Sequence, residues 1–270
     1  VAEGQVHITA GVAALVAAVV LGNRKGFPTQ GMMPHNMTMT VTGAGMLWVG
    51  WFGFNGGSAL AANGDAAMAM LVTHISAAAG SLAWMAMEWK KFGKPSALGI
   101  ATGMVAGLGT ITPASGFVSP AAALVIGLSA GVICFYMVIF VKHKLKIDDS
   151  LDVFPVHGIG GILGTLLAGV FASTELGLFS GYGFAKPEYT MLDQLGVQAL
   201  GVVATFVYTA LVTWVLLKLI GLFAPLRVTG DEETQGLDIA LHAARGCRLF
   251  TPDPADRLIW LTPRRHRATK

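Results

Sequence analysis

The sequence predicts an all-α polytopic membrane protein. Hydrophobic residues make up 54% of the chain and charged residues only 12%, whereas soluble domains carry about 25% charged residues. The charges are clustered between long uncharged segments, each near the roughly 20 residues that a helix needs to cross a bilayer. The two cysteines imply no disulfide framework, and we expect no nucleic-acid partner.

We predict seven membrane-spanning helices, which cover residues 5–21, 37–60, 66–89, 97–111, 118–141, 152–172 and 192–223. The fourth is short and rich in glycine, and Pro113 ends it. The seventh would be on the order of 48 Å long at about 1.5 Å per residue. It should therefore tilt within the ~30 Å hydrocarbon core or project into the cytoplasm.

The positions of lysine and arginine predict the orientation, because short cytoplasmic loops carry an excess of both. The loops after the first, third, fifth and seventh helices are basic, whereas the alternate loops hold only Lys186. We therefore predict a multi-pass protein of the cell membrane with a cytoplasmic C-terminus. The basic loop residues are Arg24, Lys25, Lys90, Lys91, Lys94, Lys142, Lys144, Lys146 and Arg227.

Two histidines stand inside apolar segments within one repeated motif. Val-His-x-x-x-Gly occurs at His7 in the first predicted helix and again at His157 in the sixth. A histidine inside a membrane segment is costly to solvate and indicates a functional site. The small residues that follow each histidine would let the two helices approach closely. Two neutral imidazoles that face each other in a narrow pore could share a proton and accept one from a passing donor.

Two other interpretations of the pair stay open. His7 and His157 could be core histidines that hydrogen-bond to helix backbone. They could also be axial haem ligands, as in membrane b-type cytochromes. Haem needs wide space between helices, whereas the glycine-lined faces favour close packing.

The segment WFGFNGGS at 51–58 ends the second predicted helix on the outer side of the membrane. Aromatic residues at this depth can be ordinary interfacial residues. Alternatively they form a cation site, in which the ring of Phe54 attracts an ammonium-like ion and the hydroxyl of Ser58 accepts a hydrogen bond from it. By the charge rule, both residues stand at the outer mouth, where a cation would enter.

The remaining polar residues favour structural roles. In the motif Pro34-His35-Asn36, Asn36 is predicted to cap the second helix. His74 is predicted to hydrogen-bond across helices. Three carboxylates precede the helix of His157, where they favour the helix dipole: Asp148, Asp149 and Asp152.

These motifs together resemble the ammonium transporter family (Amt/Mep/Rh) over about residues 1–244. The resemblance implies a trimer of helical bundles, each with its own narrow hydrophobic pore, and two inverted five-helix repeats followed by an eleventh helix. This chain would supply spans five to eleven and so be N-terminally incomplete. The motifs are VHITAG at 6–11, PHN at 34–36, GWFGFNGGSALAAN at 50–63, TPASG at 112–116, DDSLDVFPVHGIGGILG at 148–164 and GYGF at 181–184.

The resemblance also implies roles for single residues. The twin pore histidines of the family match His7 and His157, one of its two gate phenylalanines matches Phe54, and the serine of its outer ammonium site matches Ser58. The family's first four spans, its second gate phenylalanine, its vestibule tryptophan and an acidic residue before the first histidine have no counterpart in this sequence. The resemblance therefore implies an ammonium channel or transporter of nitrogen metabolism, which is not an enzyme and needs no metal or cofactor.

We expect two regions, a membrane domain over residues 1–226 and a cytoplasmic tail over residues 227–270. The tail shows no helical pattern and departs from the family after about residue 245. The expected partners are ammonium or ammonia, the lipid bilayer, two further copies of the chain, and a PII-type signalling protein at the tail. The alternatives are a membrane b-type cytochrome, an ammonium sensor and an inactive transporter fragment.

Overall fold

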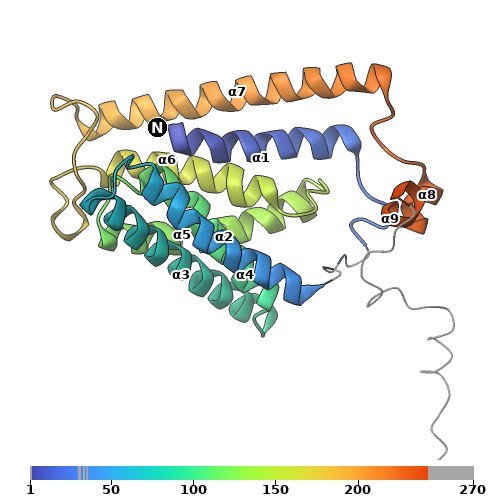
Figure 1. The fold of residues 1–270 in the computed structure, drawn as a ribbon, viewed down its shortest axis with the longest axis horizontal. Coiled ribbons are helices and arrows are strands. Elements are labelled where there is room, and N and C mark those ends of the chain that lie inside the picture. The colour runs from blue at the N-terminus through green and yellow to red at the C-terminus, as the bar shows by residue number, and fades with distance from the viewer. Residues whose placement is uncertain (1, 30–31, 33, 35, 243–270) are drawn as a thin grey trace, which may run out of the picture.

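The described part of the chain is built from helices and loops and holds no strand. The computed structural model describes residues 2–29, 32, 34 and 36–242. A helix occupies each of the seven ranges predicted from the sequence (Figure 1). These helices are α1 (Ala2–Leu21), α2 (Met37–Gly57), α3 (Gly64–Phe92), α4 (Ala97–Ile111), α5 (Pro120–Ile139), α6 (Gly160–Phe171) and α7 (Met191–Phe223).

Five helical segments of the described residues are long and apolar enough to cross a membrane: Gly64–Phe92, Ala97–Ala114, Pro120–Lys144, Phe154–Phe171 and Met191–Phe223. α1 adds a shorter apolar helix, Gln5–Leu21. α7 has 33 residues, which at about 1.5 Å per residue makes it on the order of 50 Å long. Its length agrees with the sequence-based expectation of a helix longer than the bilayer core.

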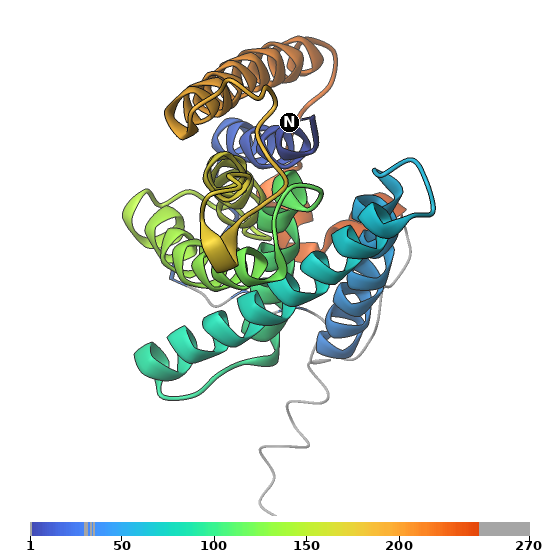
Figure 2. The same cartoon turned by 90° about the vertical axis from the view of Figure 1, so that its left-hand side faces the viewer.

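α1 lies between α7 and α6 in both views of the molecule (Figures 1 and 2). α3, α4 and α5 pack against one another on the other side of α6, and α2 lies to one side, against α3 and α4. Short π-helical turns extend two of the long helices. Phe140–Lys144 (η2) follows α5, and Phe154–Ile159 (η3) precedes α6 and carries His157. Such turns recur at functional sites.

Glycine lets the backbones of α3 and α4 touch. A Cβ atom at Gly80 would lie 2.4 Å from the carbonyl oxygen of Gly103, so only glycine fits there. The Ser76 hydroxyl donates to the Gly107 carbonyl at 2.8 Å and adds a hydrogen bond between the same two helices. α2 packs against both of these closely packed helices, and α6 packs against α4.

The helix ends follow the predicted capping residues. The Asn36 side chain accepts a hydrogen bond from the Met39 amide at 2.9 Å and caps α2. α4 ends at Ile111, and Pro113 lies in the 3-10 turn that follows, Thr112–Ala114 (η1). His35 of the same predicted motif as Asn36 lies outside the described residues.

The expectation of a tail without helices was wrong over residues 230–242. Two short helices, α8 (Gly230–Gln235) and α9 (Leu237–His242), follow α7. The Thr229 side chain and the Glu232 side chain cap the start of α8 reciprocally, which is the stabilising pattern of a capping box. The atypical end of the chain after residue 242 lies outside the described residues.

Candidate functional site

The two motif histidines meet in the structure. His7 Nδ1 lies 3.1 Å from His157 Nδ1, a distance typical of a direct hydrogen bond. The rings face each other with centroids 5.2 Å apart and planes at 15°. One Nδ1 must therefore carry the hydrogen and donate, while the other accepts. His7 is buried, with 5% of its surface exposed.

Close helix packing brings the pair together. A Cβ atom at Gly161 would lie 2.9 Å from the Cβ of His7, and one at Gly11 would overlap the backbone of Gly158. The repeated motif thus places a glycine at each point where the two histidine-bearing segments approach most closely. Behind the pair, a Cβ atom at Gly109 of α4 would lie 3.8 Å from both Nδ1 atoms, so this glycine leaves the rings their space.

Trp51 is a member of this site that the sequence interpretation missed. Its ring stacks on His7, with centroids 5.2 Å apart and planes at 15°, and is nearly parallel to His157 at 5°. The indole N–H donates to Thr112 Oγ1 at 2.8 Å. The sequence interpretation left the aromatic residues of 51–58 open between an interfacial and a cation-binding role and named only Phe54 and Ser58 as site residues. The spacing of Trp51, three positions before Phe54, was the available signal, because side chains at i and i+3 share a helix face.

Phe54 lies beside the histidines, whereas Ser58 lies farther along α2. The centroid of the Phe54 ring is 6.4 Å from that of His7, and the ring meets that of Trp51 edge-on. Phe54 is 44% exposed. The Ser58 hydroxyl donates to the Phe54 carbonyl at 2.9 Å, at the end of the helix. The structure therefore brings three predicted site residues together and places the fourth one turn away.

An apolar groove of about 510 Å³ runs between α1 and α2 beside these residues. His7 lines the groove, and its Nε2 is buried and has no hydrogen-bond partner among the described residues. None of the lining side chains is charged. A ligand in this groove would meet apolar side chains and the rings of His7, Trp51 and Phe54, but no charged group. The groove is lined by Val6, His7, Gly43, Met46, Leu47, Gly50, Trp51 and Phe54.

The haem interpretation does not fit this geometry. The two Nδ1 atoms bond each other directly and the ring centroids are only 5.2 Å apart, so a haem does not fit between the two imidazoles. Within the described part of the chain, no group of three histidine, cysteine or carboxylate side chains is arranged to hold a metal ion.

The prediction that His74 hydrogen-bonds across helices was wrong. Among the described residues His74 has no hydrogen-bond partner and contacts aromatic rings of α2 instead. Its ring centroid lies 5.1 Å from that of Trp48 and 6.0 Å from that of Phe52. His74 is exposed and stands apart from the histidine pair.

The three carboxylates before the His157 turn each have a basic or amide partner. Asp148 pairs with Arg24 at 2.7 Å, and Asp152 pairs with Lys142 at 2.7 Å. The hydrogen bonds from Arg24 hold the pKa of Asp148 below its usual value, whereas burial raises the pKa of Asp152. Asp149 accepts hydrogen bonds from backbone amides.

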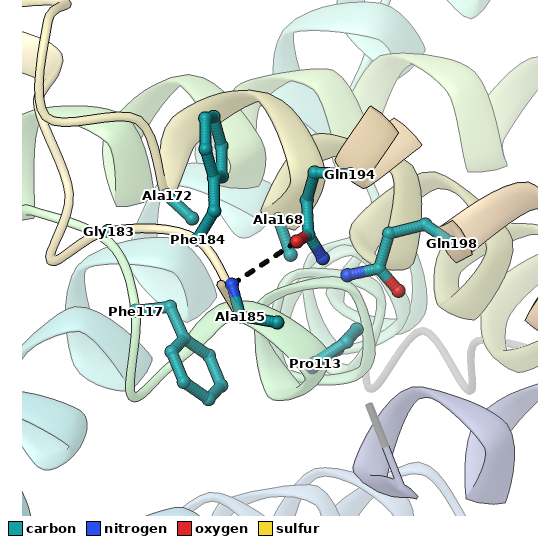
Figure 3. A pocket seen from close by; sticks show the side chains of 9 residues that line it. All are labelled: Pro113, Phe117, Ala168, Ala172, Gly183, Phe184, Ala185, Gln194 and Gln198. Atoms are coloured by element: carbon teal, nitrogen blue, oxygen red, sulfur yellow. Dashed lines mark hydrogen bonds between the residues drawn. The ribbon is translucent and has the colours of Figure 1, made fainter. Parts of the chain in front are cut away.

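A second, smaller cavity of about 100 Å³ lies where α7 begins (Figure 3). The side chains of Gln194 and Gln198 reach from α7 toward the loop segment around Ala185, whose amide donates to Gln194 Oε1 at 3.3 Å. The walls are otherwise mostly apolar. This cavity contains none of the predicted site residues.

A fold built from helices, with several apolar spans and an uncharged groove beside paired histidines, indicates a multi-pass membrane protein. The chain belongs to the Ammonium Transporter Family, whose model matches residues 2–247. It is 46% identical over 237 residues to the ammonium transporter Amt1 of Archaeoglobus fulgidus. It is also 45% identical over 244 residues to an ammonium transporter of Aquifex aeolicus.

Solved structures of the family have the same fold. A structure titled "Sensor Amt Protein" superimposes with a TM-score of 0.80 at 32% identity, over 89% of this chain and 59% of that one. Mep2 of Saccharomyces cerevisiae gives a TM-score of 0.73 at 36% identity, over 84% of this chain and 53% of that one. The Archaeoglobus and Aquifex matches cover 88% and 90% of this chain but 59% and 56% of those relatives. The chain thus spans less than two thirds of the length of these relatives.

Proposed function

We propose that this chain is the part of an ammonium transporter that holds the twin histidines of the pore. The observation that carries this proposal is the pair His7 and His157, joined at 3.1 Å beside an uncharged groove. An ammonium ion would be held at the outer mouth by the ring of Phe54 and by the Ser58 hydroxyl. It would then give up its proton, and neutral ammonia would pass the two histidines.

His7 suits the role of proton acceptor when it donates from Nδ1, because its Nε2 then carries no hydrogen. Nε2 of His7 is buried and unpartnered within the described residues, so it can take a proton that a neighbouring N–H gives up. Ammonium would lose that proton and leave as ammonia, while the imidazole becomes an imidazolium until the proton moves on. K⁺ has no proton to give and would lose its water without compensation among the apolar walls. This difference would make the passage selective.

We also propose the regional division and assembly that the family resemblance implies. Residues 1–226 would form the membrane domain and residues 227–270 the cytoplasmic tail, where a PII-type signalling protein would bind. Three copies would assemble, each with its own pore. The complete pore would need the portion of the family that this chain does not match.

The test uses a chimera that supplies this unmatched portion. The N-terminal region of the Archaeoglobus relative is joined ahead of residue 1, and the product is reconstituted in liposomes. We expect ammonium flux with little K⁺ flux, and we expect His157→Ala to reduce the ammonium flux or to admit K⁺. His74→Ala is the matched control, because it removes an imidazole that does not touch the pair. Unchanged ammonium/K⁺ discrimination in His157→Ala would disprove the proposed role.

Growth of a transporter-deficient host tests the chain alone. At low ammonium and acidic pH, uncharged ammonia is scarce, so growth depends on a transporter. We expect the chimera to restore growth and the 270-residue chain alone not to restore it. Rescue by the chain alone would show that the described helices already make a working pore.

A sensor is the second candidate, and the neighbour titled "Sensor Amt Protein" favours it. Such a protein would bind ammonium at the same residues and signal through its tail. A chimera that binds ammonium but gives no flux in liposomes would favour the sensor over the transporter.

A further inference from the structure

Two adjacent carboxylates reach the two histidine-bearing helices from one loop, residues 145–153. Asp148 faces the end of α1. Its Oδ2 accepts hydrogen bonds from the Arg24 backbone amide and from Arg24 Nε, both at 2.8 Å, and its Oδ1 accepts one from Arg24 Nη2 at 2.7 Å. The Asp148 side chain is 1% exposed. Arg24 follows the last residue of α1, the helix that carries His7, by three positions.

Asp149 faces the other helix. Its Oδ1 accepts from the Val153 amide at 3.0 Å and its Oδ2 accepts from the Phe154 amide at 2.7 Å. Phe154 is the first residue of the π-helical turn that carries His157. Asp149 is buried, with 4% of its surface exposed. Its carboxylate thus satisfies amides that the helix start leaves without a partner.

The backbone between these contacts is held in an unusual conformation. Asp152 has φ +57°, in the left-handed region that residues other than glycine seldom adopt. The Asp149 hydrogen bonds lie on one side of it, and the Asp152 carboxylate itself is paired with Lys142 at 2.7 Å. Residues in such conformations persist where the surrounding contacts fix them. The start of the His157 turn is therefore held by side chains.

We infer that Asp148 and Asp149 form one clamp that positions His157 against His7. Asp148 fixes the end of the His7 helix, and Asp149 fixes the start of the His157 turn. Because the two are neighbours in the chain, the distance between these attachment points is nearly constant. Neither carboxylate lines the groove, so both are positioning residues.

The helix crossing alone does not fix the pair. Gly11 packs against the backbone of Gly158 and Gly161 packs against His7, but both contacts lie near the histidines and leave the far end of α1 to be held by other contacts. The clamp holds α1 a second time, beyond its C-terminal end at Leu21. At about 1.5 Å per residue, Arg24 lies on the order of 25 Å along the chain from His7. A small tilt there changes the alignment of the shared hydrogen bond, which weakens steeply as its angle departs from linear.

The clamp also stays charged at neutral pH. The Arg24 guanidinium and amide hold the pKa of Asp148 below its usual value, so the carboxylate is ionised whenever the protein works near neutrality. Charge-assisted hydrogen bonds of this kind are shorter and stronger than neutral ones. Arginine suits the position because its planar group can bind both carboxylate oxygens at once.

The test reads the histidine pair directly. The chain is labelled with ¹⁵N-histidine, placed in detergent micelles at mildly alkaline pH, and the nitrogen–nitrogen coupling across the His7–His157 hydrogen bond is measured by NMR. We expect Asp148→Ala and Asp149→Ala each to abolish this coupling and Asp149→Asn, which keeps an acceptor oxygen, to retain part of it. Asp65→Ala is the control, because Asp65 lies in the first turn of α3, a helix that carries neither pair histidine, and accepts a hydrogen bond from the Asn63 side chain; this variant should leave the coupling intact.

Each outcome decides the inference. Loss of coupling in the clamp variants with an unchanged helical circular dichroism signal supports positioning. Full coupling in both Asp148→Ala and Asp149→Ala would overturn it, and so would equal loss in Asp65→Ala. If a variant unfolds, Arg24→Lys, which keeps the charge but not the two-oxygen contact, gives the same test.

The inference takes its functional meaning from the proposed ammonium transport, but its readout needs no transport. Failure of the His157→Ala flux test with a clamp-dependent coupling would reject the proposed function and keep the clamp. If the chimera is selective but the coupling is unchanged in both carboxylate variants, the proposed function would be kept and the clamp rejected.

Discussion

The indole N–H of Trp51 donates to Thr112 Oγ1 at 2.8 Å, and this bond joins α2 to the turn that ends α4. Because it fixes the plane of the indole, the ring lies within 15° of the plane of His7 and within 5° of that of His157. Three nearly parallel rings from three separate segments thus lie next to one another, with the Trp51 centroid 5.2 Å from that of His7 and 6.4 Å from that of His157. The orientation of the Trp51 ring therefore depends on the Thr112 hydroxyl, which lies outside this group of rings.

Replacement of that hydroxyl should destabilise the protein. In Thr112→Val the buried Trp51 N–H loses its partner, and an unsatisfied buried donor costs about 1–3 kcal/mol. We expect a lower unfolding temperature in detergent. Thr102→Val is the control, because the Thr102 hydroxyl bonds only to the Leu98 carbonyl of its own helix. Equal losses in the two variants would contradict the role given to the Trp51 bond.

The crossing of α1 and the His157 turn should tolerate no side chain at Gly11. A Cβ atom there would overlap the backbone of Gly158, and overpacking of this kind costs roughly 1–3 kcal/mol. We expect Gly11→Ala to lower the unfolding temperature and to broaden the NMR signals of both pair histidines. Gly196→Ala on α7, where no neighbouring atom lies within 4 Å, should leave both unchanged. A harmless Gly11→Ala would mean that the helices can separate without cost.

The ion pair of Arg24 and Asp148 should stabilise the protein in a pH-dependent way. The pKa of Asp148 lies below its ordinary value of 3.8 because Arg24 donates hydrogen bonds to it. A carboxyl group whose pKa is lowered in the folded state stabilises the protein fully above its ordinary pKa, and this stabilisation is lost as the pH falls through the folded-state pKa. We therefore expect Arg24→Gln to lower the unfolding temperature at neutral pH, and the difference from the wild type to shrink progressively below about pH 5. A constant difference down to strongly acidic pH would contradict this linkage.

The first helix of the tail should depend on its capping box. Thr229 Oγ1 and the Glu232 carboxylate bond each other's backbone amides, and loss of such a cap costs about 1 kcal/mol. We expect Thr229→Ala to speed hydrogen exchange over residues 230–235, and Thr229→Ser, which keeps a hydroxyl, to preserve protection. Glu233 also accepts from the Lys25 amide at 2.7 Å, so exchange at Lys25 should rise together with that of α8. If hydrogen exchange at Lys25 does not change together with that of α8, α8 is not docked on the α1–α2 loop.

The sequence predicted the helices and the histidine pair for physical reasons that can be named. Charged side chains are costly in lipid and therefore gather between the apolar helices, so their positions mark the helix boundaries. Helices occupy all seven predicted ranges. A buried histidine is rare enough that its recurrence in one motif predicted the meeting of His7 and His157. The role of Trp51 beside the histidines was not predicted, because an indole is equally common at a membrane interface and in the wall of a site.

Other features could not be read from the pattern. α8 and α9 have six residues each, too short for a helical period to emerge, although Thr229 and Glu232 stood at capping-box spacing. His74 was expected to find a polar partner, but the aromatic rings of α2 lie next to it instead. The pairing of Asp148 with Arg24 joins positions 124 residues apart, and only the folded chain brings them together.

The shared hydrogen between His7 and His157 gives the pair a polarity. A neutral imidazole holds one N–H, so when His7 donates from Nδ1 its own Nε2 is a bare acceptor. His157, which then accepts at Nδ1, must carry its hydrogen on Nε2 and is a donor at that end. The two outward nitrogens are therefore always opposite in character, and reversing one reverses the other. The outer ends of the pair therefore present an acceptor at one imidazole and a donor at the other.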